Sequence, residues 1–124
     1  MKSMFKILII FLFSFVLTEN INDNFIYSDG LLLRGKIYYQ IKDYKPYTGK
    51  VVEVNQDING NKYVKKEFHL LNGVYHGQYI EWMYHNVIRK GNYVDGLKDG
   101  LWIEYKELTG GTKEVKYDYG IKIK

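Results

Sequence analysis

The sequence contains no cysteine and only one proline, Pro46. The absence of cysteine excludes disulfide bonds, thiol catalysis, cysteine-ligated metals and a lipid anchor attached to cysteine. Outside the extreme N-terminus there is no helix-like run of Ala, Glu and Leu. The stability of the folded part must therefore come from packing and strand pairing alone.

An excess of one charge is also missing. The net charge is +4, and Lys2 and Lys6 belong to the N-terminal segment, so the remainder carries only +2. Acidic and basic residues alternate, as in the segment 65–67, Lys-Lys-Glu. This pattern predicts a mixed, solvated surface and no nucleic-acid partner. Because no glycine-rich phosphate loop is present either, we expect no cofactor.

What the chain does contain is tyrosine and glycine. Its 124 residues include 13 Tyr and 12 Gly, and aromatic residues make up 17%. Tyrosine-rich segments separated by glycine turns are typical of β-structure. A chain of this length has room for one modest domain.

The first 18 residues resemble an export signal. Lys2 and Lys6 precede an apolar run that begins at Ile7 and ends at Leu17, too short for the roughly 20 residues that cross a bilayer. We expect a signal peptide over residues 1–18, a domain over 19–124, and a protein exported to the periplasm, cell envelope or medium. An uncleaved membrane anchor, or an apolar strand or helix packed on the domain, are the alternatives.

The domain is internally repeated. Segment Gly91–Tyr105 has a looser copy in Phe68–Trp82 and a partial copy in Thr48–Val54. The pairs Asn72–Gly73 and Asp95–Gly96 have the residues that tight hairpin turns require. The repetition predicts an all-β fold, an elongated antiparallel meander of repeated β-hairpins that follows the N-terminal signal segment.

Further glycines and both ends of the domain complete this predicted architecture. Gly77 and Gly100 are expected to restart the chain after each turn. Residues Phe25–Tyr39 are expected to form an upstream hairpin that turns at or near Asp29–Gly30. Residues Ile121–Lys124 are expected to begin a final edge strand.

Side-chain alternation assigns the repeated residues to two faces. One face is wholly apolar and is expected to pack: Val52, Val54, Ile80, Trp82, Ile103 and Tyr105. The other combines large residues with carboxylates and is expected to remain partly uncovered: Val51, Glu53, Tyr79, Glu81, Trp102 and Glu104.

The motif Gly-Asn-Tyr-Val-Asp-Gly-Leu-Lys-Asp-Gly-Leu-Trp-Ile-Glu-Tyr, residues 91–105, resembles the MORN-repeat variant of bacterial proteins. The segment Lys45–Val51 is similar to the entry segment of those proteins, and the resemblance extends over about residues 27–120. It implies an extended antiparallel sheet that contacts proteins and, in some eukaryotic members, phospholipid membranes. Many members of the family are labelled antitoxin components of toxin–antitoxin systems, which implies a partner that is bound and neutralised.

Two groups of residues suggest catalysis or metal binding. The carboxylates Glu53, Glu81 and Glu104 could act as a glycosidase pair, but a row of equivalent residues favours cross-strand pairing with lysines. The three histidines lack the spacing of a metal site and are expected at the surface; they are His69, His76 and His85. We therefore predict no catalytic residue and no metal.

The remaining candidates are partner-binding residues. Tyr79 and Trp102 are the aromatic anchors, with Glu81 and Glu104 beside them and Tyr75 as a further candidate. The alternative is that these rings pack along the sheet. The sequence thus predicts a non-enzymatic module for protein–protein interaction, with antitoxin-like or immunity-like neutralisation of a partner. A membrane-surface binder, or an envelope protein that stacks glycans on Trp82 or Trp102, is the alternative function.

Overall fold

The structure of the chain, a computed structural model, describes residues 24–123. The predicted signal peptide, residues 1–18, lies outside the described residues. Within them, no helix has the length and apolar character that crossing a membrane would require. The elements are β1 (Phe25–Tyr27), the 3₁₀ helix η1 (Ser28–Gly30), β2 (Leu31–Arg34), β3 (Ile37–Gln40), β4 (Gly49–Gln56), β5 (Lys62–Leu71), β6 (Val74–Met83), β7 (Asn86–Val94), β8 (Leu97–Tyr105), β9 (Thr112–Asp118) and β10 (Ile121–Ile123).

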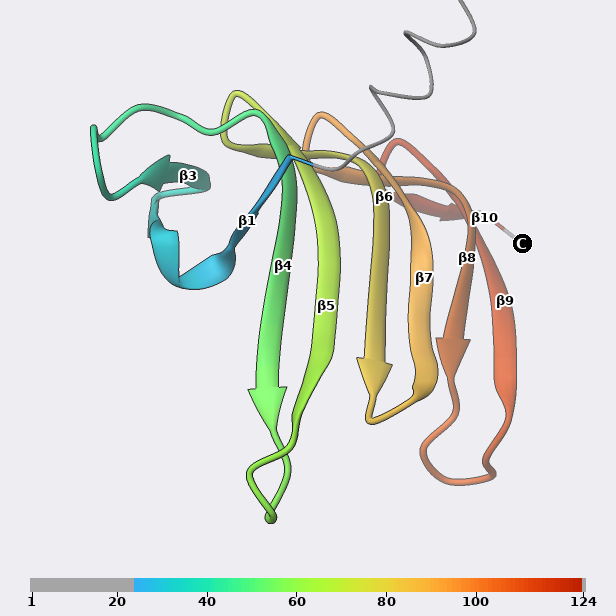
Figure 1. Ribbon diagram of the computed structural model, residues 1–124. Helices are drawn as coiled ribbons and strands as arrows, with labels where there is room; N and C mark the ends of the chain where they lie inside the picture. Colours follow the sequence, from blue (N-terminus) through green and yellow to red (C-terminus); the bar gives the residue numbers. More distant parts are fainter. Residues whose placement is uncertain (1–23, 124) are drawn as a thin grey trace, which may run out of the picture.

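The predicted all-β meander is confirmed. Strands β4 to β10 follow one another in space as in the sequence, and each pairs antiparallel with the next. Figure 1 shows these strands side by side as one curved sheet. Strand β10 forms one edge, as expected for the end of the chain.

The opposite edge differs from the prediction. Strand β1 pairs in parallel with β4, and the Asp29–Gly30 pair belongs to η1. The upstream hairpin consists of β2 and β3 and turns at Gly35, whose φ is 63°. The Asp29–Gly30 pair is the stronger turn signal in the sequence, but here it forms part of a 3₁₀ helix and not a hairpin turn.

The turns between repeats have the predicted chemistry. Asn72 and Gly73, and likewise Asp95 and Gly96, all have positive φ, as a two-residue hairpin turn of the type favoured by strand twist requires. Each turn is hydrogen-bonded to the preceding repeat through the N–H of its glycine. These bonds are Gly73 N–H to Tyr47 O (2.8 Å), Gly96 N–H to Tyr75 O (2.8 Å) and Gly120 N–H to Lys98 O (2.7 Å).

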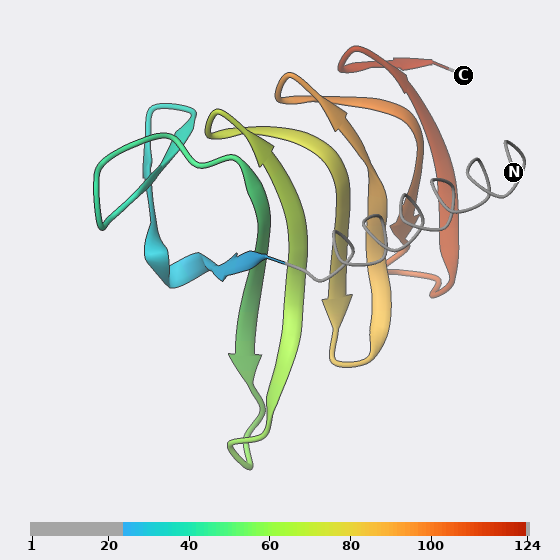
Figure 2. The ribbon, with the colours of Figure 1, turned by 45° about the horizontal axis from the view of Figure 1, so that its top comes forward.

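Gly77 and Gly100 do not restart the chain, which corrects the prediction. Both lie inside strands, in β6 and β8, with φ of 106° and 75°. The pairing register shifts opposite each of them, between Phe68 and Leu70 and between Lys90 and Asn92. These bulges bend the strands. Figure 2 shows the turn ends of the hairpins, by which we mean the ends that carry the turns, bending away from the direction of the rest of the strands.

The core lies on one face of this bent sheet. Its buried residues come from strands β4, β5, β6 and β8, and they are Val51, Phe68, Leu70, Tyr79 and Trp102. Tyr38 of β3 packs against this cluster. We call this the inner face and the opposite one the outer face. Because the sheet is a single layer, the outer face has no second sheet of the described chain over it.

Candidate functional site

The predicted partner-binding residues lie on the inner face. Trp102 is 0% exposed and Tyr79 is 5% exposed. The expectation that their face remains partly uncovered is therefore wrong. The rings pack along the sheet, which was the alternative interpretation of the sequence. The reason is the bend at Gly77 and Gly100, which folds the turn ends of the hairpins onto this face.

Trp102 occupies space that a glycine leaves open. A Cβ atom on Gly91 of the adjacent strand would overlap the indole ring. The indole Nε1 donates a hydrogen bond to the carbonyl oxygen of Asn92 at 3.0 Å. In the preceding repeat the equivalent positions hold Phe68 and Tyr79, whose rings stack with centroids 6.3 Å apart. A small and a large residue in one copy thus correspond to two medium rings in the other.

Tyrosines near the hairpin turns cover the rings of Tyr79 and Trp102. Tyr93 contacts both, with centroids 5.5 Å from Tyr79 and 5.0 Å from Trp102. Tyr75 stacks on Tyr93 at 4.8 Å, and Tyr117 packs edge-on to Trp102 at 6.4 Å. Desolvation by this burial raises the pKa of the phenols of Tyr75, Tyr79 and Tyr93 above the ordinary value. The cluster is a continuous aromatic layer, and its role is to hold the repeats together.

The predicted carboxylates lie beside this layer in ion pairs. Glu81 Oε1 accepts hydrogen bonds from Arg89 Nη1 and from the Tyr79 hydroxyl, both at 2.8 Å. Glu104 Oε1 accepts one from Lys98 Nζ at 3.1 Å. Burial lowers the pKa of Arg89, and the attraction of Glu81 more than offsets this, so that the net shift is upward.

These glutamates belong to a row of alternating charge that crosses the sheet. The cross-strand partners in order are Glu53, Lys66, Glu81, Arg89, Glu104 and Lys113. Opposite charges placed directly across strands stabilise a sheet. The side chains of Glu81 and Glu104 are only 13% and 18% exposed. This geometry accounts for the repeated glutamates by pairing, without assigning any of them to a reaction.

The histidines lie at three unrelated positions. The Nδ1 atom of His69 is 3.3 Å from the carbonyl oxygen of Gln78, the Nδ1 atom of His76 accepts from the N–H of Asp95 at 3.3 Å, and His85 lies between β6 and β7. Among residues 24–123 no three His, Asp or Glu side chains gather as a metal site would require.

The outer face holds the residues that were expected to pack, and of these only Val52, which is 8% exposed, is buried. Near the loops between β4 and β5, β6 and β7, and β8 and β9, each of the strands β4 to β8 carries one apolar residue of what we call the outer band. Two pairs of them are direct cross-strand partners, Val54 with Val64 and Trp82 with Val87, and the fifth residue is Tyr105. Val54 is 36% exposed and Tyr105 is 42% exposed. The sequence identified the apolar character of three of these residues but assigned them to the wrong environment, because it contains no direct signal for the direction in which the sheet bends.

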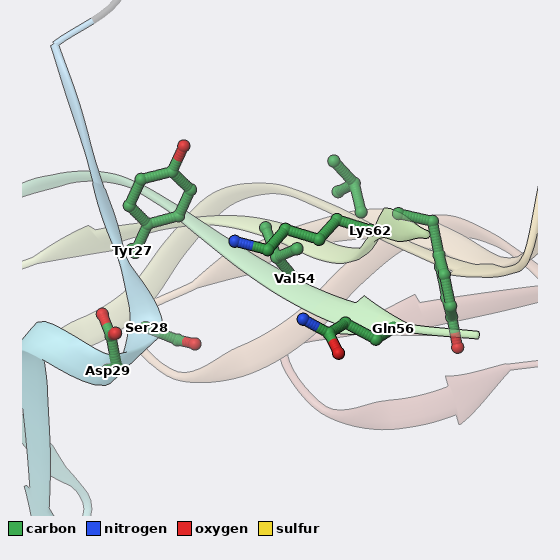
Figure 3. A pocket seen from close by; sticks show the side chains of 8 residues that line it. Tyr27, Ser28, Asp29, Val54, Gln56 and Lys62 are labelled. Atoms are coloured by element: carbon green, nitrogen blue, oxygen red, sulfur yellow. The ribbon is translucent and has the colours of Figure 1, made fainter. Parts of the chain in front are cut away.

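One further feature was not predicted, a groove at the β4 edge of the outer band. It has a volume of about 570 Å³ and is lined by Tyr27, Ser28, Asp29, Val54, Gln56, Lys62, Tyr63 and Val64. Figure 3 shows Tyr27 and Asp29 on one side of it, with Gln56 of β4 and Lys62 of β5 reaching in from the other.

Comparison with known proteins adds no relative. No protein-family model matches the chain, no curated protein matches it, and no solved structure matches its fold. The resemblance to MORN repeats therefore remains a prediction from the motif.

Proposed function

We propose that the chain is a non-enzymatic MORN-like binding module that holds a partner protein against the outer band. The observation that carries this proposal is a set of partly exposed apolar side chains, one on each of five adjacent strands of a single-layer sheet, two pairs of which are direct cross-strand partners. Contiguous apolar patches of this kind mark interaction surfaces in folded proteins. The inner face, in contrast, is already occupied by the aromatic layer.

The residue types and their surroundings favour a protein as the ligand. Trp82 and Tyr105 are the side chains that most often act as anchors at protein interfaces, because they bury much area with few rotamers. Above the band, apolar and charged residues alternate across the strands, with Glu67 and Lys90 flanking Ile80. An apolar centre with a mixed-charge rim is the usual anatomy of such an interface.

The motif extends the proposal to the kind of partner. Antitoxin-like or immunity-like neutralisation would require a binding surface and no catalytic group. An exported protein would meet its partner in the periplasm, the cell envelope or the medium. In this form, binding itself is the activity, and it would act by covering a surface of the partner.

The test uses a photo-crosslinking amino acid at position 105, with Tyr44 as the control position because it is exposed and lies in the loop between β3 and β4, outside the outer band. We expect one protein to be captured reproducibly from envelope extract at position 105 and not at position 44.

Tyr105→Lys should then weaken binding of that purified protein by about tenfold or more, because a charge replaces an apolar contact. Leu33→Lys, an exposed site on β2, should leave it unchanged. Equal loss with both lysine variants would contradict the proposal.

A membrane surface is the second candidate, favoured by the three loops between paired strands. Each loop carries an exposed apolar residue, and these are Ile58, Tyr84 and Leu108. Figure 1 shows the three loops at the same end of the sheet. Aliphatic and aromatic tips beside lysines suit an interface with anionic lipid. Co-flotation with vesicles containing phosphatidylglycerol, lost in an Ile58→Ser, Leu108→Ser double variant, would support this candidate in place of the first.

A further inference from the structure

Strand β1 covers only half of the edge of β4. Its three residues pair with Lys50, Val51 and Val52, while β4 continues to Gln56. Beyond Tyr27 the chain turns away through η1. The last four residues of β4 therefore have no strand on that side among the described residues. At about 3.3 Å per residue, they form a stretch of edge roughly 13 Å long that no strand of the described chain covers, with η1 close to β4.

The backbone along this open edge can accept another strand. The N–H of Asp57 is bonded to the carbonyl of Asn61 across the hairpin at 2.9 Å. Because the bonding direction alternates along a strand, the polar backbone groups of Val54 and Gln56 point to the free edge. The Asn55 side chain accepts the Gln56 N–H at 2.9 Å, which leaves Val54 as the main free donor.

The groove described above lies on this same edge. Tyr27, Val54 and Val64 give it an apolar floor, and each of them is at least one third exposed. Asp29 on one side and Lys62 on the other supply opposite charges, and neither forms an ion pair with another described residue. A free edge, an apolar slot and a charge at each side are the features that bind an extended peptide.

We propose that this groove binds an extended segment of the partner protein as an added strand on β4, in line with β1. The segment places an apolar side chain between Tyr27 and Val54 and a basic side chain beside Asp29. This inference rests on the proposed function, because the groove shares Val54 and Val64 with the outer band. It adds that the partner binds at this edge through the hydrogen bonds of its own main chain.

The experiment uses a displayed library of random peptides of about 12 residues, long enough to span the edge. The library is selected against the purified full-length chain, and the affinities of the synthesised hits are measured by fluorescence anisotropy. Val54→Pro removes the free edge donor, and proline is tolerated on an edge strand. The matched control is Glu114→Pro. The Glu114 N–H points away from β8, on the side of β9 where β10 pairs only with residues 116–118, so it is also an edge donor but on the opposite side of the sheet. We expect about tenfold or greater loss for Val54→Pro and no loss for Glu114→Pro.

A second measurement does not depend on the folding of a variant. Peptides methylated at one backbone nitrogen at a time should lose affinity at alternate positions only, since alternate N–H groups face the neighbouring strand. Asp29→Asn should weaken peptides that carry a basic residue and spare those that do not. No enriched peptide, affinity that is indifferent to N-methylation, or equal loss with both proline variants would overturn the inference. So would light scattering that shows a dimer of the chain abolished by Val54→Pro, because the edge would then hold a second copy.

These outcomes separate the inference from the function on which it rests. If position 105 still captures a partner while the peptide tests fail, strand addition is wrong and the outer band remains the binding surface. If capture at position 105 fails while the peptide tests succeed, the edge binds a segment and the band does not.

Discussion

At the scale of single residues, Trp102 and Gly91 share one volume between two strands. The indole lies where a side chain at position 91 would be, and its N–H is satisfied by Asn92. The equivalent pair Phe68 and Tyr79 fills the same layer with two rings. What the repeats share is therefore the filled volume and not the residue identities, as close packing in a core requires.

This arrangement predicts that Gly91→Ala is strongly destabilising. The new methyl group overlaps the indole, so either the ring or the backbone must move, at a cost of about 1–3 kcal/mol in the free energy of unfolding. Chemical denaturation measures the loss. Gly30→Ala is the control, because its added Cβ meets no atom within 4 Å.

The same prediction has a second-site test. Trp102→Tyr should recover part of the stability lost in Gly91→Ala, because the smaller ring makes room for the methyl group, as in the Phe68 repeat. Strict additivity of the two substitutions would show that positions 91 and 102 do not compete for one volume.

At the scale of elements, each hairpin turn is fastened by a side chain from the preceding repeat. The residue that precedes Gly49, Gly77 or Gly100 accepts a hydrogen bond from the backbone N–H of the first residue of the next hairpin turn. The three bonds are Thr48 Oγ1 with Asn72 N–H (2.9 Å), His76 Nδ1 with Asp95 N–H (3.3 Å) and Asp99 Oδ1 with Tyr119 N–H (3.1 Å). A hydroxyl, an imidazole and a carboxylate thus serve the same function.

His76→Ala should therefore lower the free energy of unfolding by roughly 0.5–1.5 kcal/mol, the net contribution of one hydrogen bond. His76→Thr should recover most of this loss, since Thr48 makes the equivalent bond in the preceding repeat. Thermal unfolding followed by circular dichroism measures both variants. His85→Ala, in a loop, is the control and should change little. A threonine variant as unstable as the alanine variant would rule out this role for His76.

The elements also show how far the sequence predicts the structure. Asn72–Gly73 and Asp95–Gly96 locate the turns because few other residues accept positive φ at both positions. The face of each strand that becomes buried could not be predicted in this way. It depends on Gly77 and Gly100, which have the same local signature as a turn but act as bulges inside strands. The outer band follows from that bend, and the β4 groove follows from the parallel pairing of β1 with β4, so neither could be identified from the chain alone.

At the scale of the whole molecule, one bent sheet packs against itself and needs no second sheet to cover its aromatic rings. The ends of the hairpins that carry the turns fold over the inner face and place Tyr75 and Tyr93 on the rings of Tyr79 and Trp102. The core thus contains one buried phenol, that of Tyr79, with several half-buried phenols packed on it, and their burial favours the neutral form. The hydroxyl groups of Tyr38 and Tyr75 are 3.2 Å apart, and that of Tyr79 is bonded to Glu81.

Alkaline pH should therefore unfold the protein cooperatively. Burial raises the pKa of Tyr75, Tyr79 and Tyr93 in the folded state, whereas an unfolded tyrosine ionises near pH 10. Their contribution to stability is complete below about pH 10 and is lost as the pH rises through the folded-state pKa values, because the unfolded state then releases protons that the folded state retains. Phenolate absorbance and far-ultraviolet circular dichroism, followed together, measure this transition. The core phenols should ionise in one steep step with loss of the sheet signal.

Tyr93→Phe, which removes one of these protons, should move the step to higher pH, and Tyr44→Phe should not. Gradual ionisation of all 13 tyrosines with an unchanged sheet signal would contradict a core built on neutral phenols.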